Sequence, residues 1–234
     1  MLDLTKSLII FSHPRSGSTW FQAGLKHYNT LELFNLSLLY HTTPYREEMK
    51  NSIGEYYKLS YPKHRYDEAD VKNELNDRFK IFNELETIHK PISVKIHTND
   101  MNDKIVNFLS TKELDYVLIE RRDKISTFWS FIVSWTTLQF HFFDPKFQEI
   151  TITKETFNQV SKMMLSFNDQ VIELKKTFPI HHLYYEDILD LEISDWWIRP
   201  NNRIKIQNAA KITTIVNREE LMSWIEEIDL FNRI

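Results

Sequence analysis

The stretch LIIFSHPRSGSTW, residues 8–20, decides the fold of this 234-residue chain. Its first four residues, Leu8 to Phe11, form a continuous apolar run, which is typical of a strand buried on both faces of a parallel sheet. A polar loop from His13 to Ser18 follows, and Thr19 to Tyr28 is predicted to be a helix. A buried strand, a polar loop and a helix in this order are typical of the start of a parallel α/β fold.

The rest of the chain continues this alternation after a stretch, residues 29–66, that is predicted to be irregular. The order predicts an α/β fold with a central parallel sheet flanked by helices, in a single domain over residues 1–234. Ligands of such sheets bind at the carboxyl ends of the strands. The predicted elements are a helix over 67–90 that Pro91 ends, a strand over 92–96, a helix over 103–109, a strand over 116–119, a helix over 123–140 with a break at Asp144 and Pro145, a helix over 153–176, a strand over 181–185 and a helix over 218–228 capped by Asn217.

Composition excludes several classes of protein. The net charge of −4 argues against broad nucleic-acid binding, which usually needs a basic face. The chain has no Cys, so it holds no disulfide and no thiolate metal site. The apolar run at Leu8 is too short for a signal peptide or a membrane span. We therefore expect a cytoplasmic protein with no nucleic-acid or membrane partner, and its oligomeric state is open.

The loop between the first strand and the first helix has the chemistry of an anion site. Backbone N–H groups before a helix attract anions, and Gly17 lets the backbone approach a ligand closely. Arg15 adds a charged fork, and further donors are the hydroxyls of Ser16, Ser18 and Thr19. The alternative is an ordinary turn in which Ser16 or Ser18 only caps the helix. The loop is not a Walker A motif, because it lacks one Gly and the Lys-Ser/Thr pair, and this makes a P-loop nucleotide or nucleoside kinase a weak alternative.

Residues Pro14 to Trp20 resemble the 5′-phosphosulfate loop of sulfotransferases that use 3′-phosphoadenosine-5′-phosphosulfate (PAPS). The common pattern of that loop is P-[KR]-[ST]-G-[ST]-[ST]-W, and all seven positions match. Arg15 gives the Arg form, which is common among bacterial and carbohydrate-type members. The resemblance implies a P-loop-like sulfotransferase fold, PAPS as the donor and 3′-phosphoadenosine-5′-phosphate (PAP) as the product.

Lys95 and His97 end the predicted strand over 92–96, and the spacing of two places them on the same face. A His can accept a hydroxyl proton near neutral pH, and a Lys can neutralise charge on a transferring group. The alternative is an edge Lys and a structural His. The pair resembles the Lys-Thr-His stretch of cytosolic sulfotransferases, with Ile96 in place of Thr. That resemblance implies that His97 is the general base and that Lys95 contacts the bridging oxygen.

Arg122 and Ser130 follow the predicted strand over 116–119 and are eight positions apart. Both can reach one phosphate if a ligand lies across the strand ends. The alternative is that Arg121 and Arg122 are solvated and that Asp123 only favours the helix start. The pattern resembles the Arg-x7-Ser site for the 3′-phosphate in the same family. Its spacing favours Arg122, and the choice between Arg122 and Arg121 stays open.

Two further stretches resemble other parts of the family's cofactor site. Tyr185 begins a Tyr-Glu-Asp run, whose Tyr lies near the adenine in the family. Lys205 and Gln207 lie in a segment that resembles the Lys-Gln-Asn stretch covering the 3′-phosphate in bacterial and Golgi-type members, although Ile206 interrupts it. The alternatives are an ordinary strand end and a solvated polar loop.

Together the motifs imply in-line transfer of a sulfuryl group from PAPS to a hydroxyl acceptor, without a metal, with Arg15 and the loop amides holding the phosphosulfate. Residues 29–90 are expected to be an insertion that shapes the acceptor pocket. The acceptor is open among sugars, phenols, lipids and peptide tyrosines, with a carbohydrate or another small molecule favoured. The remaining alternative is a non-catalytic relative that only binds nucleotide.

Overall fold

The computed structural model describes residues 3–26, 28–31, 79–80, 82–84, 86–87, 91–137, 148–190, 197 and 213–234. Most of the expected acceptor-shaping insertion, the break at Asp144 and Pro145, and both Lys205 and Gln207 lie outside these residues. Within the predicted helix over 67–90, the described residues at 79–87 are helical, which agrees with the prediction for that part.

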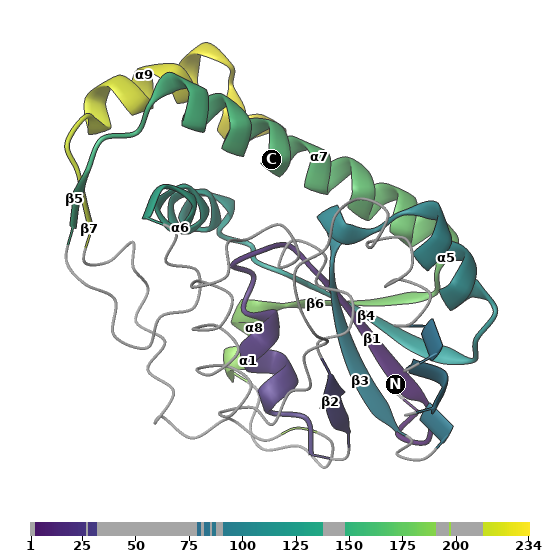
Figure 1. Ribbon diagram of the computed structural model, residues 1–234. Coiled ribbons are helices and arrows are strands. Elements are labelled where there is room, and N and C mark those ends of the chain that lie inside the picture. Colours follow the sequence, from purple (N-terminus) through teal and green to yellow (C-terminus); the bar gives the residue numbers. More distant parts are fainter. Residues whose placement is uncertain are drawn as a thin grey trace.

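Five parallel strands form a central sheet in the order β2-β3-β1-β4-β6 (Figure 1). This sheet, with helices on both faces, confirms the predicted α/β fold. Because β1 lies between β3 and β4, the loop that follows β1 starts beside the carboxyl ends of both neighbours. The strands are β1 Ser7–Ser12, β2 Asn29–Leu31, β3 Ile92–His97, β4 Leu114–Glu120 and β6 Ile180–Tyr184.

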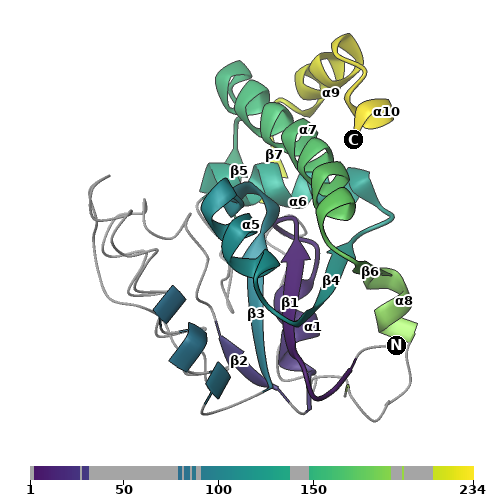
Figure 2. The ribbon, with the colours of Figure 1, turned by 90° about the vertical axis from the view of Figure 1, so that its right-hand side faces the viewer.

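Helices cover both faces of the sheet, as Figures 1 and 2 show. Two of them, α5 and α7, cover one face, and α1 and α8 cover the other. The helix α6 follows β4, and α9 and α10 end the chain. The helices are α1 Ser18–Ala23, α5 Asp103–Ser110, α6 Lys124–Thr137, α7 Lys154–Thr177, α8 Tyr185–Asp190, α9 Arg218–Glu227 and α10 Leu230–Arg233, and a 3-10 helix, η3, spans Thr98–Asp100.

The strand sequences explain this two-sided burial. Alternate residues of a strand point to opposite faces, so Ile9 and Phe11 pack with α5 and α7, whereas Leu8 and Ile10 pack with α1 and α8. Every residue of β1 and β3 is buried, which is why β1 has no polar alternation in its apolar run. We call the two faces the α7 face and the α1 face.

A third apolar cluster, apart from those on the two faces of the sheet, joins α6, α7, α9 and α10. Beside it, β5 Gln148–Ile150 and β7 Thr213–Ile215 form a two-stranded parallel sheet (Figure 1). None of the helices in the described part of the chain is long and apolar enough to cross a membrane.

The short elements differ from the predictions. Residues 29–31 were expected to be irregular but pair with β3 as strand β2. Helix α1 ends at Ala23 instead of continuing to Tyr28, and Gly24 occupies its C-cap. Tyr185 starts α8 instead of ending the preceding strand. Neither β5 nor β7 was predicted, because strands of three residues gain their stability from a partner that is distant in the sequence.

Asn217 occupies the N-cap position of α9, but its side chain does not cap the helix. Instead the Nδ2 group donates to the Ile152 carbonyl at 2.8 Å, and Oδ1 accepts from the Ile152 amide at 2.9 Å. A second bond runs from Nδ2 to Glu220 at 3.1 Å. The side chain therefore joins the start of α9 to the segment before α7, a long-range contact that a local capping rule does not anticipate.

Candidate functional site

The loop after β1 takes an unusual backbone conformation. Arg15 has a φ of 68° and Gly17 a φ of 86°, and the Ser16 amide donates to the His13 carbonyl at 3.3 Å. A positive φ is uncommon for a residue other than Gly, so the structure around Arg15 must hold it there. Gly17 also meets the Tyr185 ring, since a Cβ at Gly17 would lie 2.2 Å from Tyr185 Cδ2. Both backbone geometry and space therefore require Gly at position 17.

The Arg15 side chain links this loop to α6. Its Nε donates to the Ser130 hydroxyl at 2.9 Å, across 115 positions of sequence, and Ser130 is buried. The structure thus brings together the Arg of one predicted phosphate motif and the Ser of the other. Because both carry hydrogen-bond donors, their meeting point is suited to an anionic group.

The remaining loop residues line the same region. Ser16 and Ser18 are buried, and the Ser16 hydroxyl has no hydrogen-bond partner among the described residues. Trp20 lies edge-on to Tyr185, with ring centroids 5.7 Å apart, and 5.0 Å from the Trp197 ring. Of these rings, Tyr185 meets Gly17, and Trp20 and Trp197 belong to the apolar cluster of the α1 face. The side chain of Thr19 is not described.

Lys95 and His97 share the α1 face, as their spacing predicts. Both are buried, and Ser12 Oγ lies 3.2 Å from His97 Nδ1. Burial, and then the Lys95 charge, lower the pKa of His97 to about 3, so the imidazole is neutral at neutral pH. Ser12 is the one hydrogen-bonding partner of the His97 ring among the described residues, which leaves Nε2 for a ligand.

The two arginines after β4 diverge. Arg121 lies with its guanidinium 4.5 Å from the Tyr185 ring centroid, and its buried Nε has no hydrogen-bond partner among the described residues. Arg122 is exposed and stacks on Tyr184 at 4.4 Å. Its Nη1 and Nη2 donate to Asp187 at 2.5 and 2.6 Å. Ser130 therefore contacts Arg15, while Arg122 is held by acidic and aromatic side chains of the α8 region.

A buried carboxylate on the α7 face was missed by the sequence analysis. Glu120, the last residue of β4, lies 2.9 Å from Lys124 Nζ, 2.6 Å from His182 Nε2 and 3.5 Å from His13 Nε2. Lys175 of α7 approaches to 3.7 Å. Burial alone would raise the pKa of Glu120, but the close approach of His13 and the hydrogen bond from Lys124 hold it well below its usual value. The sequence does carry a sign of this carboxylate: Glu120 is two residues after Leu118, and alternate residues of a strand lie on the same face of the sheet.

His13, the first residue of the loop, lies at the centre of this α7-face group. The ring stacks on Phe167 with centroids 5.0 Å apart, and Nδ1 lies 3.2 Å from Thr98 Oγ1. Burial lowers the pKa of His13, and the Glu120 carboxylate partly offsets that effect. The pKa of His182 is likewise lowered by burial and partly restored by Glu120.

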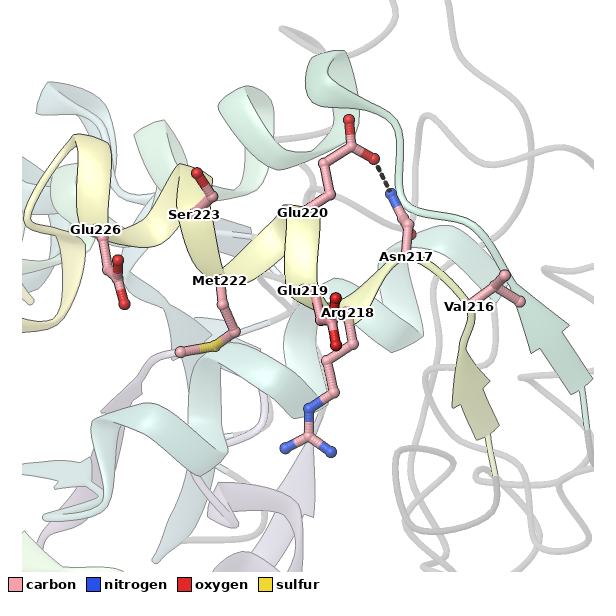
Figure 3. A pocket seen from close by; sticks show the side chains of 8 residues that line it. All are labelled: Val216, Asn217, Arg218, Glu219, Glu220, Met222, Ser223 and Glu226. Atoms are coloured by element: carbon pink, nitrogen blue, oxygen red, sulfur yellow. Dashed lines mark hydrogen bonds between the residues drawn. The ribbon is translucent and has the colours of Figure 1, made fainter.

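A shallow depression at the start of α9 lies apart from the motif residues (Figure 3). Three of its side chains are carboxylates, which disfavours an anionic ligand, and none of the motif residues lines it. It is lined by Val216, Asn217, Arg218, Glu219, Glu220, Met222, Ser223 and Glu226. Within the described residues, no group of three or more His, Cys, Asp or Glu side chains is suited to hold a metal ion.

Comparison with known proteins does not assign a family. No family model matches the chain, and no curated protein matches it. The resemblance to sulfotransferases therefore depends on the motif residues, and the contacts among those residues are the basis on which a function can be argued.

Proposed function

We propose that this protein is a PAPS-dependent sulfotransferase with a P-loop-like sulfotransferase fold, and that its acceptor is a hydroxyl group of a carbohydrate or another small molecule. One observation carries the proposal: Arg15 donates to Ser130 at 2.9 Å. These residues belong to the two motifs that resemble the 5′-phosphosulfate and 3′-phosphate sites of that family. A nucleotide with phosphates at both positions needs these two sites to be neighbours, and the contact between the two side chains supports that requirement.

In the proposed reaction the acceptor oxygen attacks sulfur in line with the bond to the bridging phosphate oxygen. A new S–O bond forms, the old S–O bond breaks, and its electron pair leaves with PAP. His97 Nε2 takes the acceptor proton, and Lys95 offsets the charge that develops on the bridging oxygen. The two side chains share the α1 face at the carboxyl end of β3, where they can act on one bond.

The pKa of His97, lowered to about 3 in the free protein, bears on its role as a base. At neutral pH the ring is deprotonated, so it can accept a proton. A base of such low pKa is weak, however, and the nearby Lys95 charge is one reason. Bound phosphate groups carry negative charge, and negative charge near a His raises its pKa. We therefore propose that the donor itself raises the basicity of His97 on binding.

The contacts favour Arg121 as the arginine that binds the 3′-phosphate. Its guanidinium lies on Tyr185, whose ring packs against Gly17 in the phosphate loop, and its Nε has no hydrogen-bond partner among the described residues. Both terminal nitrogens of Arg122 already donate hydrogen bonds to the Asp187 carboxylate. The spacing to Ser130 favoured Arg122, so the side-chain contacts and the motif pattern lead to different assignments.

The proposal is tested by calorimetric titration of the purified protein with PAP and, separately, with ATP and Mg²⁺. We expect PAP to bind much more tightly than ATP, because PAP carries phosphates at both the 3′ and 5′ positions. A folded protein that does not bind PAP would refute the sulfotransferase proposal. Binding of ATP with Mg²⁺ in preference to PAP would favour a nucleotide or nucleoside kinase instead.

A further inference from the structure

His13 is buried, with a relative exposure of 3%, and both of its ring nitrogens face polar side chains. Nδ1 lies 3.2 Å from Thr98 Oγ1, and Nε2 lies 3.5 Å from Glu120 Oε1. Thr98 directly follows β3, and Glu120 ends β4. One imidazole therefore contacts the carboxyl ends of both strands that flank β1.

We propose that His13 is a positioning residue, which holds the phosphate loop in shape by bridging Thr98 and Glu120. The loop turns directly after it: the His13 carbonyl accepts from the Ser16 amide, and Arg15 adopts its positive φ within that turn. Such a backbone conformation persists where the surroundings over-determine it. The ring of His13 fixes the first residue of the turn, and Phe167 fixes the plane of the ring.

Glu120 is suited to anchor this arrangement because other residues hold it independently of the loop. Lys124 donates to Oε1 at 2.9 Å, and His182 contacts Oε2 at 2.6 Å. The carboxylate stays charged, since its pKa is held below the usual value. It therefore places a permanent negative charge 3.5 Å from Nε2 of His13, whose pKa is lowered by burial.

The same bridge touches the reaction centre. Thr98 is the residue after His97, so a contact that fixes Thr98 also fixes the chain beside the proposed base. The effect of His13 on turnover depends on the proposed function, whereas its effect on the shape of the loop does not. Measuring the shape of the loop in the free protein therefore tests the role of His13 separately from the sulfotransferase proposal.

The test compares His13→Phe with His182→Phe as a matched control. Both changes remove an imidazole from Glu120, but His182 lies on β6 and is not part of the loop. Phe at position 13 retains the ring that stacks on Phe167. In the free protein we expect hydrogen exchange of the Ser16, Gly17 and Ser18 amides to accelerate about ten-fold in His13→Phe, the loss expected for one buried hydrogen bond, and to be unchanged in His182→Phe.

A second readout uses the ligand. PAP should bind about ten-fold more weakly to His13→Phe than to the natural protein, while His182→Phe should bind it normally. His13→Gln places an amide near the position of Nε2 and should recover part of both losses. It also replaces His13→Phe in the comparison if the Phe variant fails to fold, and a smaller loss in the same loop amides is then expected.

Three outcomes decide the matter. Equal effects of His13→Phe and His182→Phe on exchange and on PAP binding would show a general stabilising role for both histidines and overturn the positioning role. Loop amides that exchange at the natural rate in His13→Phe would overturn it as well. Faster exchange confined to the loop supports it, even if the natural protein binds no PAP, in which case only the sulfotransferase proposal fails.

Discussion

The α7 face and the α1 face of the sheet meet at the same carboxyl edge, yet the buried polar side chains on the two faces differ in their contacts. On the α7 face, Glu120 accepts a hydrogen bond from Lys124 and lies within 3.5 Å of the Nε2 atoms of His13 and His182, so that this carboxylate has its counter-charges within the fold. On the α1 face, the buried Nε of Arg121 has no hydrogen-bond partner among the described residues, and the His97 ring bonds to the described residues only through Nδ1, which contacts Ser12. Buried polar groups usually find partners, and an exception calls for an explanation. Here the difference separates groups that hold the edge in shape from groups that are suited to a ligand.

The largest expected effect concerns the α1 face. His97→Ala should lower kcat about 10²- to 10⁴-fold, the range for the loss of a general base, while leaving the fold intact. Steady-state turnover of PAPS with an acceptor found by screening measures the effect, and circular dichroism checks the fold. Turnover near the natural rate in a folded variant would show that His97 is not the base. The α1 face would then no longer differ from the α7 face by carrying a reactive histidine.

The second prediction compares the contributions of Arg121 and Arg122 to PAP binding. Arg121→Ala should weaken PAP binding about ten- to a hundred-fold, because a charge-assisted contact is lost, whereas Arg122→Ala should change it little. Calorimetric titration of both variants with PAP provides the comparison. A larger loss in Arg122→Ala would show that the motif spacing, and not the side-chain contacts of the free protein, identifies the binding arginine.

The third prediction concerns the α7 face. Glu120→Gln keeps the size of the side chain but removes the charge that His13, His182 and Lys124 share. It should lower the free energy of unfolding by about 1–3 kcal/mol, the cost of weakening buried hydrogen bonds to a charged group. The control is Glu173→Gln on α7, whose exposed pair with Lys176 should contribute less than about 1 kcal/mol. Urea denaturation measures both, and equal changes would show that the Glu120 group is no more than a surface network.

The fourth prediction is a dependence of stability on pH. The folded pKa values of His13, His97 and His182 all lie below the ordinary value of 6.5. As pH falls below 6.5, the unfolded chain therefore binds more protons than the folded protein does. Stability from these residues is complete above pH 6.5 and is lost below it, and for His97 the loss continues toward pH 3.

Urea denaturation at pH 7.5, 6.5, 5.5 and 4.5 measures this loss. We expect a decrease of up to about 1.4 kcal/mol per pH unit from a fully buried histidine such as His97, and a shallower slope in His97→Ala. The lowered pKa of Glu120 adds a further loss below pH 4.5. Stability that rises between pH 7 and pH 5 would contradict the neutral, buried state of these rings.

The longer elements of the fold were predictable, and the short ones were not. The apolar run at Leu8–Phe11 predicted β1, because a strand buried on both faces carries its own signal. The strands β2, β5 and β7 have three residues each, and pairing partners distant in the sequence decide whether they form. Helix α8 starts at Tyr185 inside a run that also fits a strand end, so local pattern did not separate the two.

The candidate site shows the same division. Alternation along β3 predicted that Lys95 and His97 share a face, and both do. The contact of Arg15 with Ser130 agrees with motifs at neighbouring strand ends. The Glu120 group was not predicted, because it depends on how β1, β4 and β6 pair and on where α7 crosses them. Such groups become visible only when the register of the strands is known.

The contact between Gly17 and the Tyr185 ring also has a consequence for folding during synthesis on the ribosome. Domains are made from the N-terminal end, so the loop His13–Ser18 emerges early, long before Ser130 and Tyr185. Until those residues follow, the loop lacks the surfaces that enclose it. If the protein binds a nucleotide as proposed, a nascent chain that stops before Tyr185 should be unable to hold it, and binding should be acquired late in synthesis.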